Sequence, residues 1–346
     1  MRADSGLSIA ILGGRRTAAW YDGEDPVASE LATRLVAAGH RVSLLCGAHD
    51  TLEAASLRIL QRVQRRTPVL GVFDDALFLA RCVRGCDLIY VIGGRSLWST
   101  LLAPLLGACV WFRVDGAVRR RMLPWLRSAT LVVDSEATLA QLRAVMGRLP
   151  PARVIPPGAD TPGGQDPERL AEWELAPGCY YLLVGRPRRE NRVQEIIEGF
   201  LAAHSTFPLV IVGAIDVDTA YAAQLRGYAG ARVRFIGPVD APRQAVLRCH
   251  ALACFHGNAV GSPSLLGALG CGAPLIAYDT PVNREFAGDL AWYFSGPQDL
   301  PAAITWAEDL GGPERRAHAA AARARIVERH AWERVIALHQ SGLVQP

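Results

Sequence analysis

The feature that most constrains the fold is a repeated alternation of short apolar runs with amphipathic segments. The apolar run at residues 8–13 ends in a glycine pair. The amphipathic segment 26–38 follows and ends before Gly39, and residues 41–46 form the next apolar run. A strand, a glycine turn, a helix and a second strand in this order open a doubly wound parallel sheet. The sequence therefore predicts an α/β fold.

The chain has the length of two such domains. With 346 residues, it is long for one hydrophobic core and suits two α/β domains of ordinary size. Residues 156–177 are rich in proline and glycine, which indicates a linker. We expect a first domain at 1–155, the linker at 156–177 and a second domain at 178–325. A long helix is predicted at about 314–339. Its end lies in a last segment, 326–346, which could cross back to the first domain.

Further strands are predicted from the same alternation. In the first domain they fall at 87–92, 109–114, 130–133 and 152–155. In the second domain they fall at 179–184, 208–212, 232–236, 251–255 and 274–278, with helices at 192–203 and 262–269.

Composition excludes several classes of protein. The formal charge of +4 is mild for this length and its charges are interspersed, so nucleic-acid binding gains little support. Eight cysteines occur without a CxxC pair, which is typical of reduced core thiols rather than disulfides or a zinc site. We see no signal-peptide pattern and no apolar run of membrane-spanning length, so we expect a cytoplasmic protein.

A glycine-rich loop in the second domain indicates a site for a phosphorylated ligand. It joins the predicted strand 251–255 to the helix 262–269. Gly257 and Gly261 would let the backbone approach a ligand closely, and Ser262, Pro263 and Ser264 would begin a helix with proline at a favoured position. Free N–H groups at a helix start attract a diphosphate. The plain alternative is an ordinary glycine-rich turn of a Rossmann domain.

The order of motifs along the chain carries a resemblance to a known family. From residue 256 the sequence reads His-Gly, Val-Gly, Pro-Ser-Leu-Leu and Asn-Arg-Glu, and further motifs are Tyr-Asp-Gly-Glu at 21–24, Val-Asp-Gly at 114–116, Ile-Pro-Pro-Gly-Ala-Asp at 155–160 and Val-Gly-Arg at 184–186. This pattern resembles the rhamnosyltransferase-like branch of the retaining GT-B glycosyltransferases, in the glycosyl transferases group 1. The resemblance implies two Rossmann-like doubly wound domains facing a central cleft.

The resemblance also implies roles for individual residues. Arg186 would neutralise the diphosphate as the sugar leaves, Glu285 would contact the donor sugar, and Asp115 would orient or deprotonate an acceptor hydroxyl. The alternatives are a surface arginine, a loop ion pair and an exposed turn aspartate. The expected donor-binding residues are His256, Gly257, Gly261, Ser262, Ser264, Asn283, Arg284 and Glu190. His256 could instead cap its strand.

One position departs from the family pattern. The wider family carries a glutamate that holds the nucleotide ribose, and Gly267 stands in its place. Three interpretations stay open: another carboxylate, Asp279 or Glu285, substitutes for it; the nucleotide is a deoxyribose one; or the chain is a catalytically impaired GT-B-like protein that serves as a binding partner of another transferase.

The sequence thus predicts a glycosyltransferase. It would move rhamnose or another hexose or deoxyhexose from a nucleotide diphosphate to a glycan, lipid-linked or natural-product acceptor, with retention of configuration implied by the resemblance. No cofactor or metal is expected, because the pair Asp216 and Asp218 lies in an unsuitable loop. The segment 119–126, three arginines followed by apolar residues, could touch a membrane, although one solvated helix edge is the more ordinary interpretation.

Overall fold

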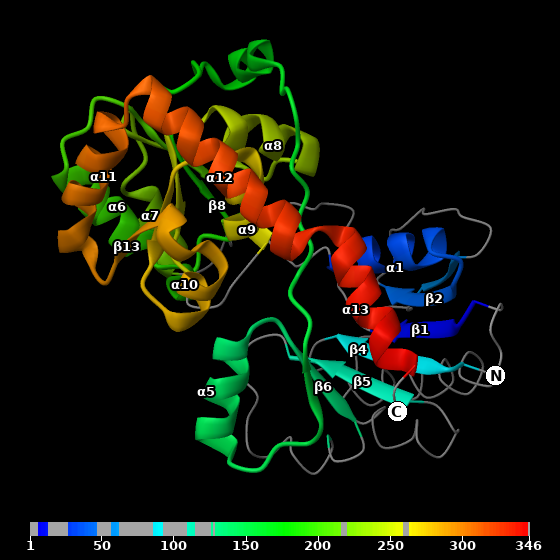
Figure 1. The fold of residues 1–346 in the computed structure, drawn as a ribbon. Coiled ribbons are helices and arrows are strands. Elements are labelled where there is room, and N and C mark those ends of the chain that lie inside the picture. Colours follow the sequence, from blue (N-terminus) through cyan, green and yellow to red (C-terminus); the bar gives the residue numbers. More distant parts are fainter. Residues whose placement is uncertain are drawn as a thin grey trace. The chain divides into compact units, whose positions relative to one another are not determined.

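The computed structural model describes residues 6–12, 27–46, 57–61, 86–92, 109–114, 126, 129–215, 220–258 and 263–344 (Figure 1). These residues fall into two compact units. The first holds the described residues before Gly158 together with those from Trp332 onward, and the second holds Gly158–Ala331. Each unit contains one sheet whose described strand pairs are all parallel.

The first unit is built on a sheet of strand order β3-β2-β1-β4-β5-β6-β7. Its strands are β1 (Ser8–Leu12), β2 (Arg41–Cys46), β3 (Leu57–Gln61), β4 (Leu88–Ile92), β5 (Cys109–Arg113), β6 (Thr130–Val133) and β7 (Ala152–Val154). Its described helices are α1 (Val27–Ala37), α5 (Glu136–Met146) and α13 (Trp332–Val344).

The two faces of the first sheet are covered by different helices, because successive strand residues point to opposite sides. Ile9 and Ile11 pack in one buried cluster with residues of α1 and α13. Ala10 and Leu12 belong to the cluster on the other face, which includes residues of α5. This double coverage explains the continuous apolar runs seen in the sequence.

The second unit is built on a sheet of strand order β10-β9-β8-β11-β12-β13. Its strands are β8 (Tyr181–Val184), β9 (Leu209–Val212), β10 (Val233–Gly237), β11 (Ala253–His256), β12 (Leu275–Tyr278) and β13 (Ala291–Phe294). Its helices are α6 (Val193–Ala202), α7 (Ala220–Arg226), α8 (Ala241–His250), α9 (Pro263–Cys271), α10 (Pro281–Ala287), α11 (Leu300–Asp309) and α12 (Gly312–His330). Short 3₁₀ turns lie at η5 (Pro167–Trp173), η6 (Arg189–Asn191), η7 (Gly288–Leu290) and η8 (Pro297–Asp299).

Both sheets have the strand order of a doubly wound fold. Counted within its own unit, each sheet runs 3-2-1-4-5-6, with one extra strand at the end of the first. The chain reverses direction across the sheet between β1 and β4 in the first unit and between β8 and β11 in the second. Folds of this kind bind ligands at such a reversal, beside the carboxyl ends of the strands.

Helix α12 holds the ends of neighbouring helices in the second unit. Arg323 donates to the carbonyl of Cys271 at the end of α9 (2.7 Å), and Arg325 donates to the carbonyl of Glu285 near the end of α10 (2.7 Å). Arginine at a helix carboxyl end satisfies free carbonyls and opposes the negative end of the dipole. α12 therefore fixes the two helices that follow β11 and β12.

The carboxyl-terminal helix is divided. The sequence suggests one helix at 314–339, whereas the structure has α12 and α13 separated at Ala331. The carbonyl of His330 accepts the N–H of Ala159 at 2.9 Å, so the chain leaves the helical pattern there. Of the linker expected at 156–177, residues 158–177 group with the second unit, where Asp166 caps η5. Among the described residues, no helix is long and apolar enough to cross a membrane.

Candidate active site

The candidate site lies where β8 and β11 end side by side. β8 and β11 are neighbours in the sheet, and the chain leaves them toward α6 and α9. Gly185 and Arg186 directly follow β8, and His256 ends β11 with Gly257 after it. The second unit therefore brings Arg186 and the His-Gly pair to the position where a doubly wound fold binds its ligand.

The loop after β8 is shaped by hydrogen bonds to the backbone of Arg186. Gly185 adopts a positive φ of 151°, which favours glycine. The carbonyl of Arg186 accepts the N–H of Arg188 (2.8 Å) and the Nδ2 of Asn191 (2.7 Å). Arg186 itself is half-buried. These bonds close a tight turn that holds Arg186 at the strand end.

A side-chain contact links the end of β11 to the start of α9. His256 is buried, with 3% of its surface exposed, and its Nδ1 lies 3.1 Å from the Oγ of Ser264 in the first turn of α9. This contact joins the end of the strand to the start of the helix. The structure thus brings the two predicted residues His256 and Ser264 into contact.

The two loops meet at Gly257. A Cβ atom on this residue would lie 2.1 Å from the carbonyl oxygen of Asn191, so only glycine fits. Arg192 adds a hydrogen bond from Nη1 to the carbonyl of Gly257 (3.1 Å), and its guanidinium lies 3.5 Å from the centre of the Tyr278 ring. The loop after β8 is therefore in direct contact with the residue after β11 and with the end of β12.

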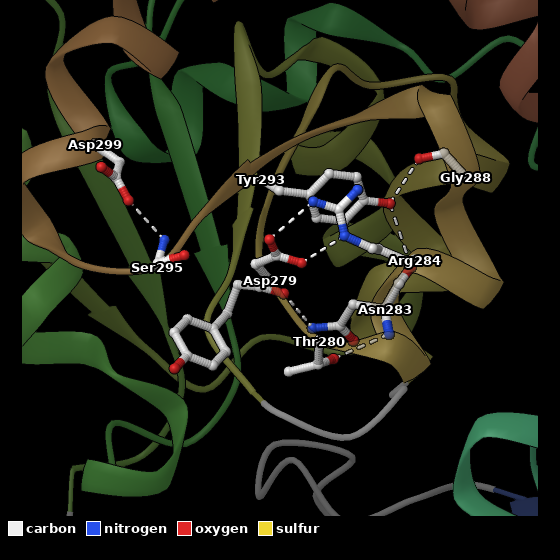
Figure 2. Close-up of polar contacts among 9 residues, drawn as sticks. Asp279, Thr280, Asn283, Arg284, Gly288, Tyr293, Ser295 and Asp299 are labelled. Carbon is white, nitrogen blue, oxygen red and sulfur yellow. Dashed lines mark hydrogen bonds and ion pairs between the residues drawn. The ribbon is translucent and has the colours of Figure 1, made fainter. Parts of the chain in front are cut away.

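Asn283 is a structural link within this site. It is fully buried on α10 (Figure 2), and its Nδ2 donates to the backbone carbonyls of Asn258 and Tyr278, both at 2.8 Å. Its own N–H is capped by the hydroxyl of Thr280 at 3.1 Å. The amide thus fixes the loop after β11 against the end of β12. We predicted a donor contact for Asn283, and the structure shows its nitrogen engaged with backbone.

Arg284 forms an ion pair rather than standing free at the site. Its Nε and Nη2 donate to the two carboxylate oxygens of Asp279 at 2.6 and 2.8 Å, and its guanidinium lies 4.3 Å from the centre of the Tyr293 ring (Figure 2). The charged hydrogen bonds hold the pKa of Asp279 below its usual value. Asp279 is therefore engaged, which weakens the idea that it replaces the missing glutamate.

The structure does not place the remaining predicted residues that it describes directly at the ends of β8 and β11. Glu285 is half-buried on α10, within a helix rather than a loop. Glu190 is exposed and lies 3.8 Å from Arg188. Asp115, Gly261 and Ser262 lie outside the described residues, as do Asp216, Asp218 and the segment 119–125. Within the described part of the chain, no three His, Cys, Asp or Glu side chains are grouped as metal ligands.

Gly267 faces a cation in the structure. A Cβ atom on this residue would lie 3.3 to 3.4 Å from three atoms of the Arg248 guanidinium. Arg248 belongs to α8, and its Nη2 donates to the Oε1 of Gln244 at 2.9 Å. The space beside position 267 is thus occupied by an arginine side chain of the neighbouring helix.

Sequence reasoning missed Arg192 and Tyr278 as site residues. Arg192 was placed at the start of a helix, where an arginine has no capping oxygen to offer. An arginine at this helix position was the one feature of the sequence that could have pointed to a role for Arg192. Tyr278 ends a predicted strand and gave no signal.

This arrangement defines a class of protein. GT-B glycosyltransferases are built from two doubly wound units, each with a parallel sheet. This chain has two such units, and in the second an arginine and a glycine lie where the strand order reverses. The sequence matches the family described as Glycosyltransferase Family 4 over residues 22–162 and the family described as Glycosyl transferase-like over residues 188–339. The chain belongs to the GT-B glycosyltransferases.

Solved structures share the fold over nearly the whole chain. A glycosyltransferase from Rickettsia africae has 11% identity and a TM-score of 0.79, with 98% of each chain covered. Sucrose-phosphate synthase from Thermosynechococcus elongatus has 20% identity and a TM-score of 0.78, again with 98% of each chain covered. HepE from Anabaena, in complex with UDP, has 16% identity and a TM-score of 0.75, with 98% of this chain and 100% of that chain covered. No curated protein matches the sequence significantly.

Proposed function

We propose that this protein transfers a hexose or deoxyhexose, rhamnose being one candidate, from a nucleoside diphosphate sugar to a glycan, lipid-linked or natural-product acceptor. The observation that carries the proposal is the convergence of Arg186, His256, Gly257 and Ser264 at the β8–β11 reversal. Structures of HepE with UDP and with UDP-glucose support a nucleotide sugar as the donor.

Arg186 is proposed to neutralise the departing diphosphate. The planar guanidinium can donate two parallel hydrogen bonds to phosphate oxygens. The start of α9 adds backbone N–H groups and the positive end of a helix dipole. Negative charge grows on the diphosphate as the bond to the sugar breaks, so these groups stabilise the transition state more than the bound donor.

The remaining roles follow the same proposal. Glu285 contacts the donor sugar, and Asp115 orients the acceptor hydroxyl. The anomeric configuration of the sugar is retained. Charge neutralisation by Arg186 and α9 removes the need for a metal ion. The reaction takes place in the cytoplasm, and no nucleic acid takes part.

A second function has a specific observation in its favour. Gly267 offers no carboxylate to a ribose, Arg248 occupies the neighbouring space, and Asp279 is bound to Arg284. A chain without a ribose ligand could serve as the binding partner of another transferase. Such a protein would release no nucleoside diphosphate, even if it bound a nucleotide sugar.

One experiment separates the two functions. A thermal-shift panel of UDP, dTDP, GDP and ADP, with their common sugar conjugates, reports binding without a known acceptor, because a ligand that binds the native state raises the melting temperature. Release of the nucleoside diphosphate from the best sugar conjugate then reports turnover. Stabilisation by at least one sugar nucleotide, with slow release of its diphosphate, is expected. No stabilisation by any compound would overturn the transferase proposal.

A further inference from the structure

Arg192 stands at a position that does not favour arginine. It is the residue that precedes α6, and its backbone lies in the left-handed region with φ 48° and ψ 32°. Side chains with a Cβ rarely adopt this conformation. Its side chain makes no capping hydrogen bond, and a cation at a helix start opposes the helix dipole. Asparagine, aspartate or glycine would suit the position better.

The other described non-glycine residues with positive φ lack comparable contacts at the site. Glu174 and His204 have φ of 54° and 55°, and both are exposed. The Arg192 side chain, in contrast, is 22% exposed and contacts Gly257 and Tyr278. Strained residues of this kind persist where the surrounding structure holds them, often at functional sites.

The side chain of Arg192 joins three strand ends. It starts from the loop after β8, donates to the carbonyl of Gly257 after β11 (3.1 Å), and stacks on Tyr278 at the end of β12 (3.5 Å to the ring centre). Its Nε also lies 3.8 Å from a carboxylate oxygen of Glu195 on α6. β8, β11 and β12 are consecutive in the sheet.

The same loop carries Arg186. Asn191, next to Arg192, donates to the carbonyl of Arg186 (2.7 Å) and packs its own carbonyl against Gly257. A displacement of Arg192 would therefore move Asn191, its chain neighbour, and through the Asn191 hydrogen bond also Arg186. Preset charges stabilise a transition state better than charges that must first be moved into place.

We propose that Arg192 is a positioning residue of the donor site, which fixes the Arg186 loop against Gly257 and Tyr278. The inference rests on the proposed function. Arg192 itself need not touch the donor. Its guanidinium makes the contact between loops, and its strained backbone brings the side chain to them.

Glycine and alanine at position 192 separate positioning from folding. Both remove the guanidinium, but glycine accepts a positive φ whereas alanine does not. We expect Arg192→Gly to melt at a higher temperature than Arg192→Ala. Both variants should lose kcat/KM by about 10- to 100-fold, mainly in kcat, as expected when preset charges are misplaced. Arg192→Lys keeps a cation above Tyr278 and should retain part of the activity.

A matched aromatic pair and a matched control complete the test. Tyr278→Phe keeps the ring and should be nearly normal, whereas Tyr278→Leu should resemble Arg192→Gly and add little to it in the double variant. His204→Gly relaxes a similar backbone strain at an exposed residue and should leave kcat/KM unchanged. Wild-type kcat/KM in Arg192→Gly, or activity that recovers in step with stability from alanine to glycine, would overturn the proposal.

Hydrogen exchange tests the contact without any reaction. The amides of Arg188 and Asn191 donate within the loop at 2.8 and 3.1 Å. They should exchange faster in Arg192→Gly and be unchanged in His204→Gly. Unchanged exchange in Arg192→Gly would overturn the positioning role. If the wild type binds no nucleotide while exchange rises as expected, the proposed function fails and the positioning role stands.

Discussion

The carbonyl oxygen of Asn191 occupies the space that a Cβ atom on Gly257 would need. The separation would be 2.1 Å, and the Cδ1 of Ile196 would lie 2.9 Å away. Two loops that leave different strands are thus packed backbone against backbone. Asn191 also donates to the carbonyl of Arg186, so this contact links Arg186 to Gly257 after β11.

We predict that Gly257→Ala displaces the loop that carries Arg186. Backbone atoms cannot yield as the tip of a side chain does, so the variant should lose about 1–3 kcal/mol of unfolding free energy, in the range for overpacked positions. It should also lose most nucleotide binding. Urea unfolding and calorimetric titration with UDP measure the two effects. Gly163→Ala is the control, because a Cβ atom there meets nothing within 4 Å. Unaltered stability and binding in Gly257→Ala would contradict the geometry.

The sequence predicts the fold well where the local pattern and the tertiary structure agree. The strands at 41–46 and 130–133 have the predicted bounds, since each is a short apolar run between turn residues. β13 was missed, although its residues Ala-Trp-Tyr-Phe suit a strand, because it follows a short helix and turn that gave no periodic signal. At the end of α12 the carbonyl of His330 accepts the N–H of Ala159, a partner distant in sequence that no local pattern can reveal.

The positions of several predicted site residues at strand ends could be read from the sequence for the same reason. Arg186, His256 and Gly257 lie at strand ends, and strand ends are readable from the sequence. Donor contacts of Asn283 and Arg284 stay predictions. Their partners within the chain are Asn258 and Tyr278 for Asn283 and Asp279 for Arg284, and these could not be read from the sequence. Arg192 gave one signal, its place at a helix start, but its contact with Tyr278 of β12 could not be read from the sequence.

We predict that Gly267→Glu stabilises the protein through Arg248. Glycine is a poor helix residue, and the new carboxylate would lie beside the Arg248 guanidinium. A gain of roughly 1 kcal/mol in unfolding free energy is expected from these two effects. UDP binding should tighten clearly only in Gly267→Glu combined with Arg248→Ala, where the carboxylate is free to accept from a ribose. Tighter UDP binding in the single variant would mean that the glutamate turns away from Arg248.

We predict that sugar transfer persists in excess EDTA. The proposed chemistry places the neutralising charge on Arg186 and the start of α9 rather than on a metal ion. Diphosphate release should keep at least half of its rate after chelation. Full loss of activity, restored by magnesium or manganese, would contradict this prediction.

We predict that acid destabilises the first unit through His339. This residue on α13 is buried, and desolvation lowers its pKa to about 4, with a smaller effect from the Arg113 guanidinium in the same direction. The unfolded chain binds the proton near pH 6.5, so stability is complete above that pH and falls as the pH drops toward 4. The loss would be on the order of 3 kcal/mol at most.

The His339→Leu variant provides the measurement. Its free energy of unfolding, followed by urea titration between pH 7 and pH 4, should decline less steeply than that of the wild type. Parallel declines would show that other groups, His318 and His40 among them, account for the dependence, since burial lowers their pKa as well.

Arg186, in the loop after β8, is proposed to bind the diphosphate of a donor nucleotide. Calorimetric titration of UDP and dTDP into the wild type, Arg186→Ala and Arg189→Ala tests it most directly. Arg189 comes from the same loop but stacks on Tyr221 of α7, at 4.4 Å from the ring centre, and so serves as the control. We predict that Arg186→Ala weakens binding at least about tenfold, as expected for the loss of a charged hydrogen bond, while Arg189→Ala binds as the wild type does. Equal affinities for the wild type and Arg186→Ala, in properly folded proteins, would contradict the account.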